Sequence, residues 1–137
     1  MSHTLKLNKD LGVIVLRAKR AMSFDEIRRV FGEMVRLADF REGLCLVADF
    51  RGSGTAISSE EIKQLAARAG EIDAAWGATR WAIIASDDLL YGLSRMFSAL
   101  TDRHRVTTHV FRSLEAADDW LGLGVEVKEI LVRTPDD

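Results

Sequence analysis

Short apolar runs alternate along the whole chain with longer segments in which apolar residues recur every three or four positions. The first pattern is typical of β-strands, and the second is typical of helices that bury one face. Helices and strands that alternate in this way pack as helices against a central sheet. The pattern therefore predicts an α/β protein.

The apolar runs predict five strands. Residues 3–7 and 12–17 are separated by Asn-Lys-Asp, which suits the tight turn of an antiparallel hairpin. Residues 44–48, Leu-Cys-Leu-Val-Ala, form a continuous apolar run that is typical of a central strand buried on both faces and parallel to a neighbour. Residues 81–85 and 107–111 predict two further strands of similar length.

Capping signals mark where the helices begin. Ser23 with Glu26, and Ser58 with Glu61, have the spacing of capping boxes, in which hydroxyl and carboxylate each accept a backbone amide proton. A third helix is expected after residues 86–88, and a fourth after Ser113. The predicted fold is a mixed β-sheet of about five strands flanked by about four helices, in the order ββαβαβαβα.

Residues 1–124 are predicted to form one domain, because neither linker nor repeat interrupts the pattern. In the extension 125–137, Val125 and Val127 alternate with Glu126 and Lys128, which suits an edge strand followed by a disordered tail. A tail helix, or an arm exchanged between the subunits of a dimer, is an alternative.

Composition and charge exclude several classes of protein. The net charge of -2, with acidic and basic residues interspersed, argues against a nucleic-acid partner. No apolar run reaches the roughly 20 residues of a transmembrane helix, and the amino-terminal residues lack the apolar region of a signal peptide. Cys45, the only cysteine, lies in an apolar run and cannot form an intramolecular disulfide. We therefore expect a cytoplasmic protein without an integral membrane segment.

The residue patterns of common catalytic and cofactor sites are absent from the sequence. His3, His104 and His109 do not have the spacing of metal ligands, so no metal site is expected. The Gly-Ser-Gly at residues 52–54 matches neither a phosphate-binding loop nor the elbow of a serine hydrolase. We therefore expect a protein without catalytic residues or cofactors.

Polar residues follow two of the central strands. Asp49, Arg51 and Ser53 come after one strand, and Ser86 and Asp87 come after the next. Ligands of open α/β sheets bind where the carboxyl ends of the strands meet. We therefore expect these five residues to share one rim, unless they serve only to end strands and cap helices.

The helix that begins near Ser58 would point its free amides towards the same rim, which favours an anion or a phosphorylated hydroxyl there. Ser58 is therefore a further candidate binding residue.

The start of the third helix is apolar on nearly all sides. Residues 89–93, Leu-Leu-Tyr-Gly-Leu, cannot all face one core. Part of this helix must therefore meet another surface or line a pocket, for which Tyr91, Met96 and Phe97 are the candidate residues. The alternative is that the carboxyl-terminal tail or the first hairpin covers it.

Three stretches carry a family resemblance. They are the strand end Leu-Val-Ala-Asp at residues 46–49 with Arg-Gly at 51–52, the helix at 92–97, and the closing segment at 110–121. With the order of the predicted elements, they resemble the SpoIIAA-like proteins, small bacterial proteins grouped with the STAS domains of anti-sigma-factor antagonists. The likeness extends over residues 5–122 and implies a STAS-like fold.

The resemblance implies a non-enzymatic regulatory module that binds a protein partner or a second copy of itself. STAS regulators are phosphorylated on a serine at the start of the helix after the third strand, where this chain offers Ser53, Ser58 and Ser59. Their Asp-Ser-Ser-Gly stretch is replaced here by Asp-Phe-Arg-Gly-Ser-Gly at residues 49–54. Relatives of this broader group are also likened to lipid-carrier folds, so the resemblance implies as the alternative a carrier of a small hydrophobic or lipid-like ligand beneath the third helix.

Overall fold

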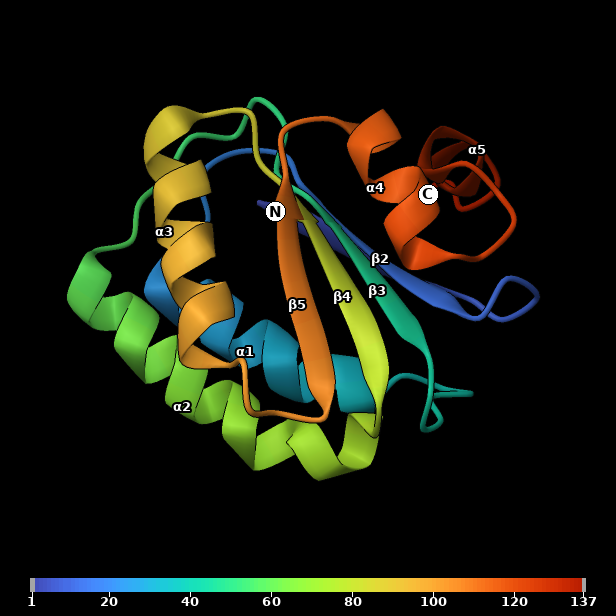
Figure 1. The fold of residues 1–137 in the computed structure, drawn as a ribbon, viewed down its shortest axis with the longest axis horizontal. Helices are drawn as coiled ribbons and strands as arrows, with labels where there is room; N and C mark the ends of the chain where they lie inside the picture. The colour runs from blue at the N-terminus through green and yellow to red at the C-terminus, as the bar shows by residue number, and fades with distance from the viewer. Residues whose placement is uncertain (1, 137) are drawn as a thin grey trace.

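The computed structural model describes residues 2–136, which form a mixed five-stranded sheet with helices on both faces (Figure 1). The sheet order follows the sequence, β1-β2-β3-β4-β5, with β1 antiparallel to β2 and every other pair parallel. The predicted α/β class, the hairpin and the five strands are therefore confirmed. The strands are β1 (His3–Asn8), β2 (Val13–Ala18), β3 (Cys45–Asp49), β4 (Thr79–Ile84) and β5 (Val106–Phe111).

In the described residues 2–136, five helices cover the sheet, where about four were predicted. They are α1 (Phe24–Val35), α2 (Ser59–Trp76), α3 (Asp88–Leu100), α4 (Leu114–Leu121) and α5 (Val127–Val132). Successive parallel strands are neighbours, and right-handed connections between them place α1, α2 and α3 on the same face. The short helices α4 and α5 cover the other face (Figure 1). No helix within residues 2–136 has the length and apolar character needed to cross a membrane.

The sheet divides the core in two because side chains of a strand point to alternate faces. Leu46 and Ala48 of β3 pack with α1, α2 and α3, whereas Val47 between them packs with α4 and α5. Residues that follow one another at a strand end therefore lie on opposite sides of the molecule.

Both predicted capping boxes are present. The Ser23 hydroxyl accepts a hydrogen bond from the Glu26 amide (3.2 Å), and the Glu26 carboxylate accepts one from the Ser23 amide (3.1 Å). Ser58 and Glu61 make the same exchange at the start of α2, with distances of 3.2 and 2.9 Å. These local signals fix where α1 and α2 begin.

The capping box at α1 makes a pH-dependent prediction. The hydrogen bond from the Ser23 backbone amide, helped by the Ser23 hydroxyl, lowers the pKa of Glu26 below its ordinary value of 4.5. A carboxylate whose pKa is lowered by folding stabilises the fold at pH values above its ordinary pKa. This stabilisation is lost as the pH falls through the lowered pKa. The Ser23→Ala variant loses the hydroxyl but keeps the backbone amide, so we expect an NMR titration to show the Glu26 pKa moved only part of the way up towards 4.5. Ser59→Ala, which alters a hydroxyl on α2, serves as the control and should leave that pKa unchanged.

The carboxyl-terminal segment differs from the predicted edge strand and tail. Residues 127–132 form helix α5, whose Val127 and Ile130 are fully buried against the sheet. The helical alternative is therefore the one that the structure adopts. Met1, in the predicted domain, and Asp137, in the predicted tail, lie outside the described residues.

Two side chains of the first hairpin hold the end of α5 and the residues after it. Arg17 donates hydrogen bonds to the carbonyls of Leu131 (2.5 Å) and Thr134 (2.6 Å). A cation suits this position because the last carbonyls of a helix carry partial negative charge. Asn8 donates to the Arg133 carbonyl (3.1 Å) and to the Thr134 hydroxyl (2.9 Å). The prediction of a disordered tail is therefore wrong as far as Thr134.

Candidate functional site

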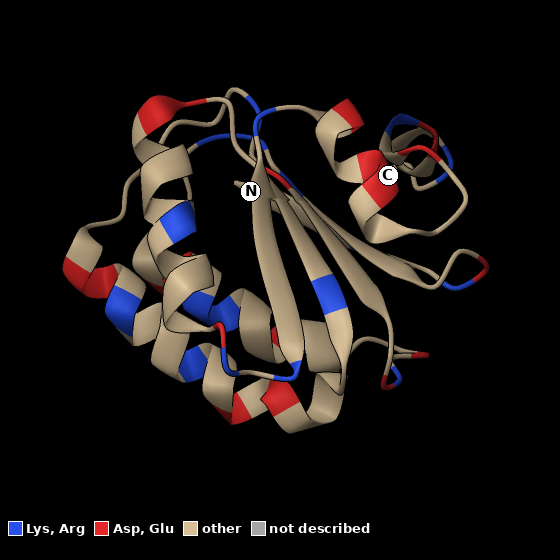
Figure 2. Ribbon diagram, in the orientation of Figure 1, with Lys and Arg blue, Asp and Glu red and all other residues tan. Residues whose placement is uncertain are grey.

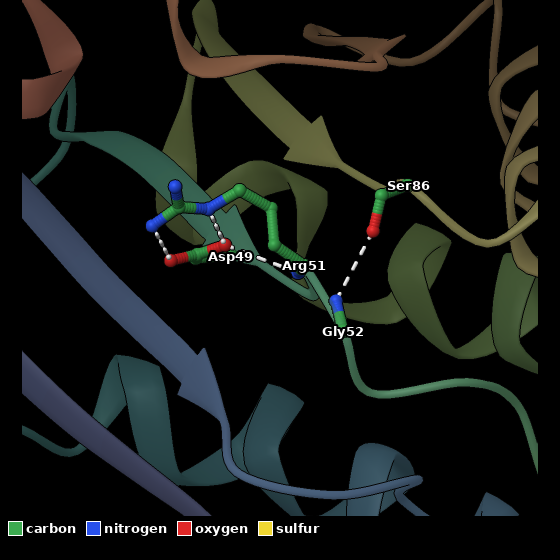
Figure 3. A network of polar contacts seen from close by, with 4 residues as sticks. All are labelled: Asp49, Arg51, Gly52 and Ser86. Atoms are coloured by element: carbon green, nitrogen blue, oxygen red, sulfur yellow. Dashed lines mark hydrogen bonds and ion pairs between the residues drawn. The ribbon is translucent and has the colours of Figure 1, made fainter.

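The carboxyl ends of β3 and β4 meet as predicted. The amide of Gly52, in the loop after β3, donates a hydrogen bond to the Ser86 hydroxyl after β4, at 3.1 Å (Figure 3). The parallel register places Asp49 beside Ile84, so the residues that follow each strand emerge at one edge. The loops that follow β3 and β4 therefore meet at this edge of the sheet.

Asp49 and Arg51 form an ion pair at this rim (Figure 3). The guanidinium donates from Nε to Oδ1 (2.9 Å) and from Nη2 to Oδ2 (3.0 Å), and the Arg51 amide donates to Oδ1 (3.1 Å). The hydrogen bond to Asp49 raises the pKa of Arg51, against the opposing effect of burial. The two opposite charges neutralise each other, and the three hydrogen bonds tie the loop after β3 to the end of that strand.

The remaining predicted rim residues serve local roles. Asp87 caps α3 by accepting a hydrogen bond from the Leu90 amide (2.9 Å), and Ser58 caps α2. The Ser53 hydroxyl donates to the neighbouring Gly54 carbonyl (3.1 Å). Within residues 2–136, no hydrogen bond or ion pair links Ser53, Ser58 or Asp87 to the Asp49–Arg51 pair. The structure thus pairs Asp49 with Arg51 and links Ser86 to the same loop through the Gly52 amide, whereas Ser53, Ser58 and Asp87 make only local hydrogen bonds.

Arg112 is a rim residue that the sequence analysis missed. It follows β5, and its guanidinium donates to the Asp88 carboxylate (2.6 Å) and the Ser86 carbonyl (3.3 Å). The guanidinium carbon also lies 4.1 Å from the centre of the Tyr91 ring, as in a cation–π contact. Its place after a parallel strand is the same signal that singled out Asp49 and Ser86.

An apolar cavity of about 70 Å³ lies on the opposite face of the sheet from the Asp49–Arg51 ion pair, between the sheet and helices α1, α2 and α3. Its wall includes Ala48 and Trp81 from the strands and Phe31, Leu65 and Phe97 from the helices. Ser94 is the polar residue in the lining, and it is buried. The predicted pocket beneath the third helix therefore has a counterpart in the structure.

The three residues predicted to line that pocket have different positions. Phe97 lines the cavity, as predicted. Tyr91 and Met96 are half-buried and pack against the core without lining the cavity. The helical period places them on other sides of α3, because the cavity-facing residues Leu90, Ser94 and Phe97 recur at steps of four and three.

The cavity comes nearest to solvent at the carboxyl edge of the sheet. Its half-buried lining residues are Ile27 in the first turn of α1, and Phe50 and Ile57 in the loop between β3 and α2. Phe50 points to the cavity side while Asp49 and Arg51 lie on the side of α4, as strand alternation requires. These three half-buried residues form the mouth of the cavity, which therefore lies on the opposite face of the sheet from the Asp49–Arg51 ion pair.

Within the described part of the chain, no group of three or more His, Cys, Asp or Glu residues is placed to hold a metal ion. Cys45 is a half-buried free cysteine, and Thr79 donates a hydrogen bond to its sulfur at 3.7 Å.

Comparison with known proteins places the fold. No family model and no curated protein matches the sequence. The structure is similar to the crystal structure of an uncharacterized protein of the DUF3478 family with a SpoIIAA-like fold, from Shewanella loihica PV-4. The two are 15% identical in sequence, the match covers 87% of this chain and 91% of the other, and the TM-score is 0.53. The chain therefore has a SpoIIAA-like fold, in agreement with the resemblance of its sequence to the SpoIIAA and STAS proteins.

Proposed function

We propose that this chain is a non-catalytic binding module that takes up a small apolar molecule, or the apolar end of a longer one, beneath α3. The cavity between the sheet and helices α1, α2 and α3 carries this proposal. Protein interiors contain few voids larger than a water molecule, and apolar cavities stay dry and bind apolar guests. A lining of apolar side chains with a single hydroxyl at Ser94 suits such a guest.

The size of the cavity limits what can enter it. Its volume of about 70 Å³ is roughly half of the ~150 Å³ of an engineered cavity that binds benzene. The present conformation therefore admits only a few carbon atoms. A longer chain would extend past Ile27 and Ile57 to the carboxyl edge of the sheet.

Binding of xenon and of dodecanoate tests this proposal, followed by NMR and by the fluorescence of Trp81 in the cavity wall. Ala48→Leu places extra carbon atoms in the cavity and should weaken binding of both probes by at least about tenfold, or ~1.4 kcal/mol. Ala116→Leu adds the same atoms at an exposed position of α4 and should leave binding unchanged.

Widening the mouth gives an independent second test. Ile57→Ala removes a half-buried side chain from the cavity lining and should strengthen the binding of dodecanoate relative to xenon. Absence of saturable binding of either probe to the unmodified protein would contradict the proposal. Equal weakening by Ala48→Leu and Ala116→Leu would contradict it as well.

A second candidate function is self-association through the start of α3. Leu89 exposes 63% of its surface here, and on another side of the same helix start the Arg112 guanidinium stacks on the Tyr91 ring. Tyr and Arg are enriched among the residues that dominate the energy of protein interfaces. Sedimentation should show a dimer that Leu89→Asp dissociates, and a monomer at high protein concentration would contradict this candidate.

Serine phosphorylation would act on the loop between β3 and α2, which contains Ser53 and ends at Ser58, the N-cap of α2. A phosphate on Ser58 would bring close to two negative charges to the capping box, next to the Glu61 carboxylate. Ser53 lies in the same loop, where its hydroxyl donates to Gly54. For a phosphate-controlled dimer, we expect Ser58→Asp to weaken self-association and Ser58→Ala to leave it intact.

A further inference from the structure

A polar hollow of about 300 Å³ lies between the first hairpin and the segment after α5. Its lining includes three cationic side chains from separate parts of the chain: Lys6 of β1, Lys9 of the hairpin turn and Arg133 after α5. Among residues 2–136, Asp10 is the one acidic residue in the lining. Figure 2 shows the hairpin turn and the α5 segment at the same end of the molecule, each carrying Lys or Arg.

The backbone around this hollow is held in place. Asn8 donates hydrogen bonds to the Arg133 carbonyl and the Thr134 hydroxyl, and its own side-chain oxygen accepts one from the Leu11 amide (3.1 Å). Arg17 donates to the Thr134 carbonyl from the neighbouring strand. These contacts bring the three cations together without any contribution from their own charges.

The three cations have no carboxylate partner in the part of the chain that the structure describes. None of the ion pairs within residues 2–136 includes Lys6, Lys9 or Arg133, and Asp10 pairs with none of them. The chain as a whole carries a net charge of -2, whereas the described lining of the hollow has more positive than negative side chains. Like charges gathered in one place repel, and an anion between them relieves that repulsion through charge-assisted hydrogen bonds.

We infer that this hollow binds a phosphate-bearing anion, either a small soluble phosphate or the headgroup of a lipid. A phosphate suits the donors present, because a guanidinium can bind it through two parallel hydrogen bonds and lysine ammonium groups act as point charges beside it. The site is separate from the apolar cavity: within residues 2–136 the two share no lining residue, and Lys6 points to the opposite face of the sheet from Leu5, which packs against the α1–α3 half of the core.

NMR titration with inorganic phosphate and with glycerol 3-phosphate tests the site directly. We expect saturable shifts of the amides around Lys6, Lys9 and Arg133. Arg133→Gln should weaken binding by about tenfold or more. Lys128→Gln, an equal charge change at an exposed position of α5 outside the hollow, should leave binding unchanged. Asp10→Asn removes the carboxylate from the lining and should strengthen binding.

Vesicles distinguish the two sources of phosphate. If the ligand is a headgroup, the protein will sediment with phosphatidylcholine vesicles that contain phosphatidic acid, and Arg133→Gln will abolish this, whereas pure phosphatidylcholine will not bind. If the ligand is soluble, only the titrations will show binding. The inference is overturned if no probe binds saturably, or if Arg133→Gln and Lys128→Gln weaken binding equally. These readouts do not depend on apolar ligands, so the two proposals stand or fall separately.

Discussion

Replacement of Trp76 by alanine is expected to lower the free energy of unfolding by about 3–5 kcal/mol. Trp76 ends α2, is fully buried, and stacks edge-on against Trp81 (5.0 Å between ring centres) and Phe40 (5.2 Å). Alanine would remove these contacts and leave a cavity that the rigid sheet cannot close. Domains of this kind are stable by about 5–15 kcal/mol, so the loss would take a large part of the total.

Phenylalanine at the same position should cost much less. The indole nitrogen of Trp76 is buried and makes no hydrogen bond within the described structure. A buried donor without a partner costs roughly 1–3 kcal/mol, and phenylalanine removes the donor while it keeps most of the aromatic surface. We therefore expect Trp76→Phe to lower the free energy of unfolding by less than about 1.5 kcal/mol.

Urea unfolding followed by circular dichroism measures both variants. An unchanged slope with a lower midpoint would show that the native state lost stability, without a change in the surface exposed on unfolding. Leu100→Ala, at an exposed position of α3, is the control and should stay within about 0.5 kcal/mol of the unmodified protein. If Trp76→Phe costs as much as Trp76→Ala, the indole N–H has a partner in solution and the packing argument is wrong.

The elements that the sequence predicts correctly are those specified by neighbouring residues. Ser23 with Glu26, and Ser58 with Glu61, form their capping boxes from four consecutive residues, so no distant contact is needed. The contact between Gly52 and Ser86 was also predictable, because the loops after neighbouring parallel strands emerge at one edge of the sheet. The same rule applied to β5 would have found Arg112.

The cavity could not be located from the sequence in the same way. Its lining residues come from three strands, three helices and a loop, and a void depends on how well their shapes fit. The surplus of apolar residues at the start of α3 indicated a pocket, but helical rotation decides that Phe97 lines it while Tyr91 and Met96 do not. Leu89, part of the same surplus, is simply exposed.

The carboxyl-terminal segment was mispredicted because its sequence fits two periods. Val125 and Val127 alternate with charged residues as in a strand, while Val127, Ile130 and Leu131 have helical spacing. A helix as short as α5 gains little from intrinsic propensity, so its packing decides. Helix α5 packs beside α4 on the same face of the sheet. Arg17 adds hydrogen bonds to the carbonyls of Leu131 and Thr134 at the end of α5.

Alanine substitution in α5 separates the two patterns. A strand would place Ile130 and Val132 on the same face, so their replacement by alanine would have similar effects. In helix α5, Ile130 is fully buried against the sheet and Val132 is 70% exposed. We therefore expect Ile130→Ala to lower the free energy of unfolding by about 2–5 kcal/mol. Val132→Ala should change it by no more than about 0.5 kcal/mol.

Urea unfolding of the two variants gives the comparison, and hydrogen exchange locates the effect. Ile130→Ala should speed exchange of the α5 amides more than those of β3, because the loss begins where the packing is removed. Val127 provides a second point on the same side of the helix, since it is also fully buried and lies one turn earlier. Equal effects at Ile130 and Val132, with little effect at Val127, would show that these residues do not pack as a helix. In that case the face of the sheet that carries α4 would not be covered by a helix at residues 127–132.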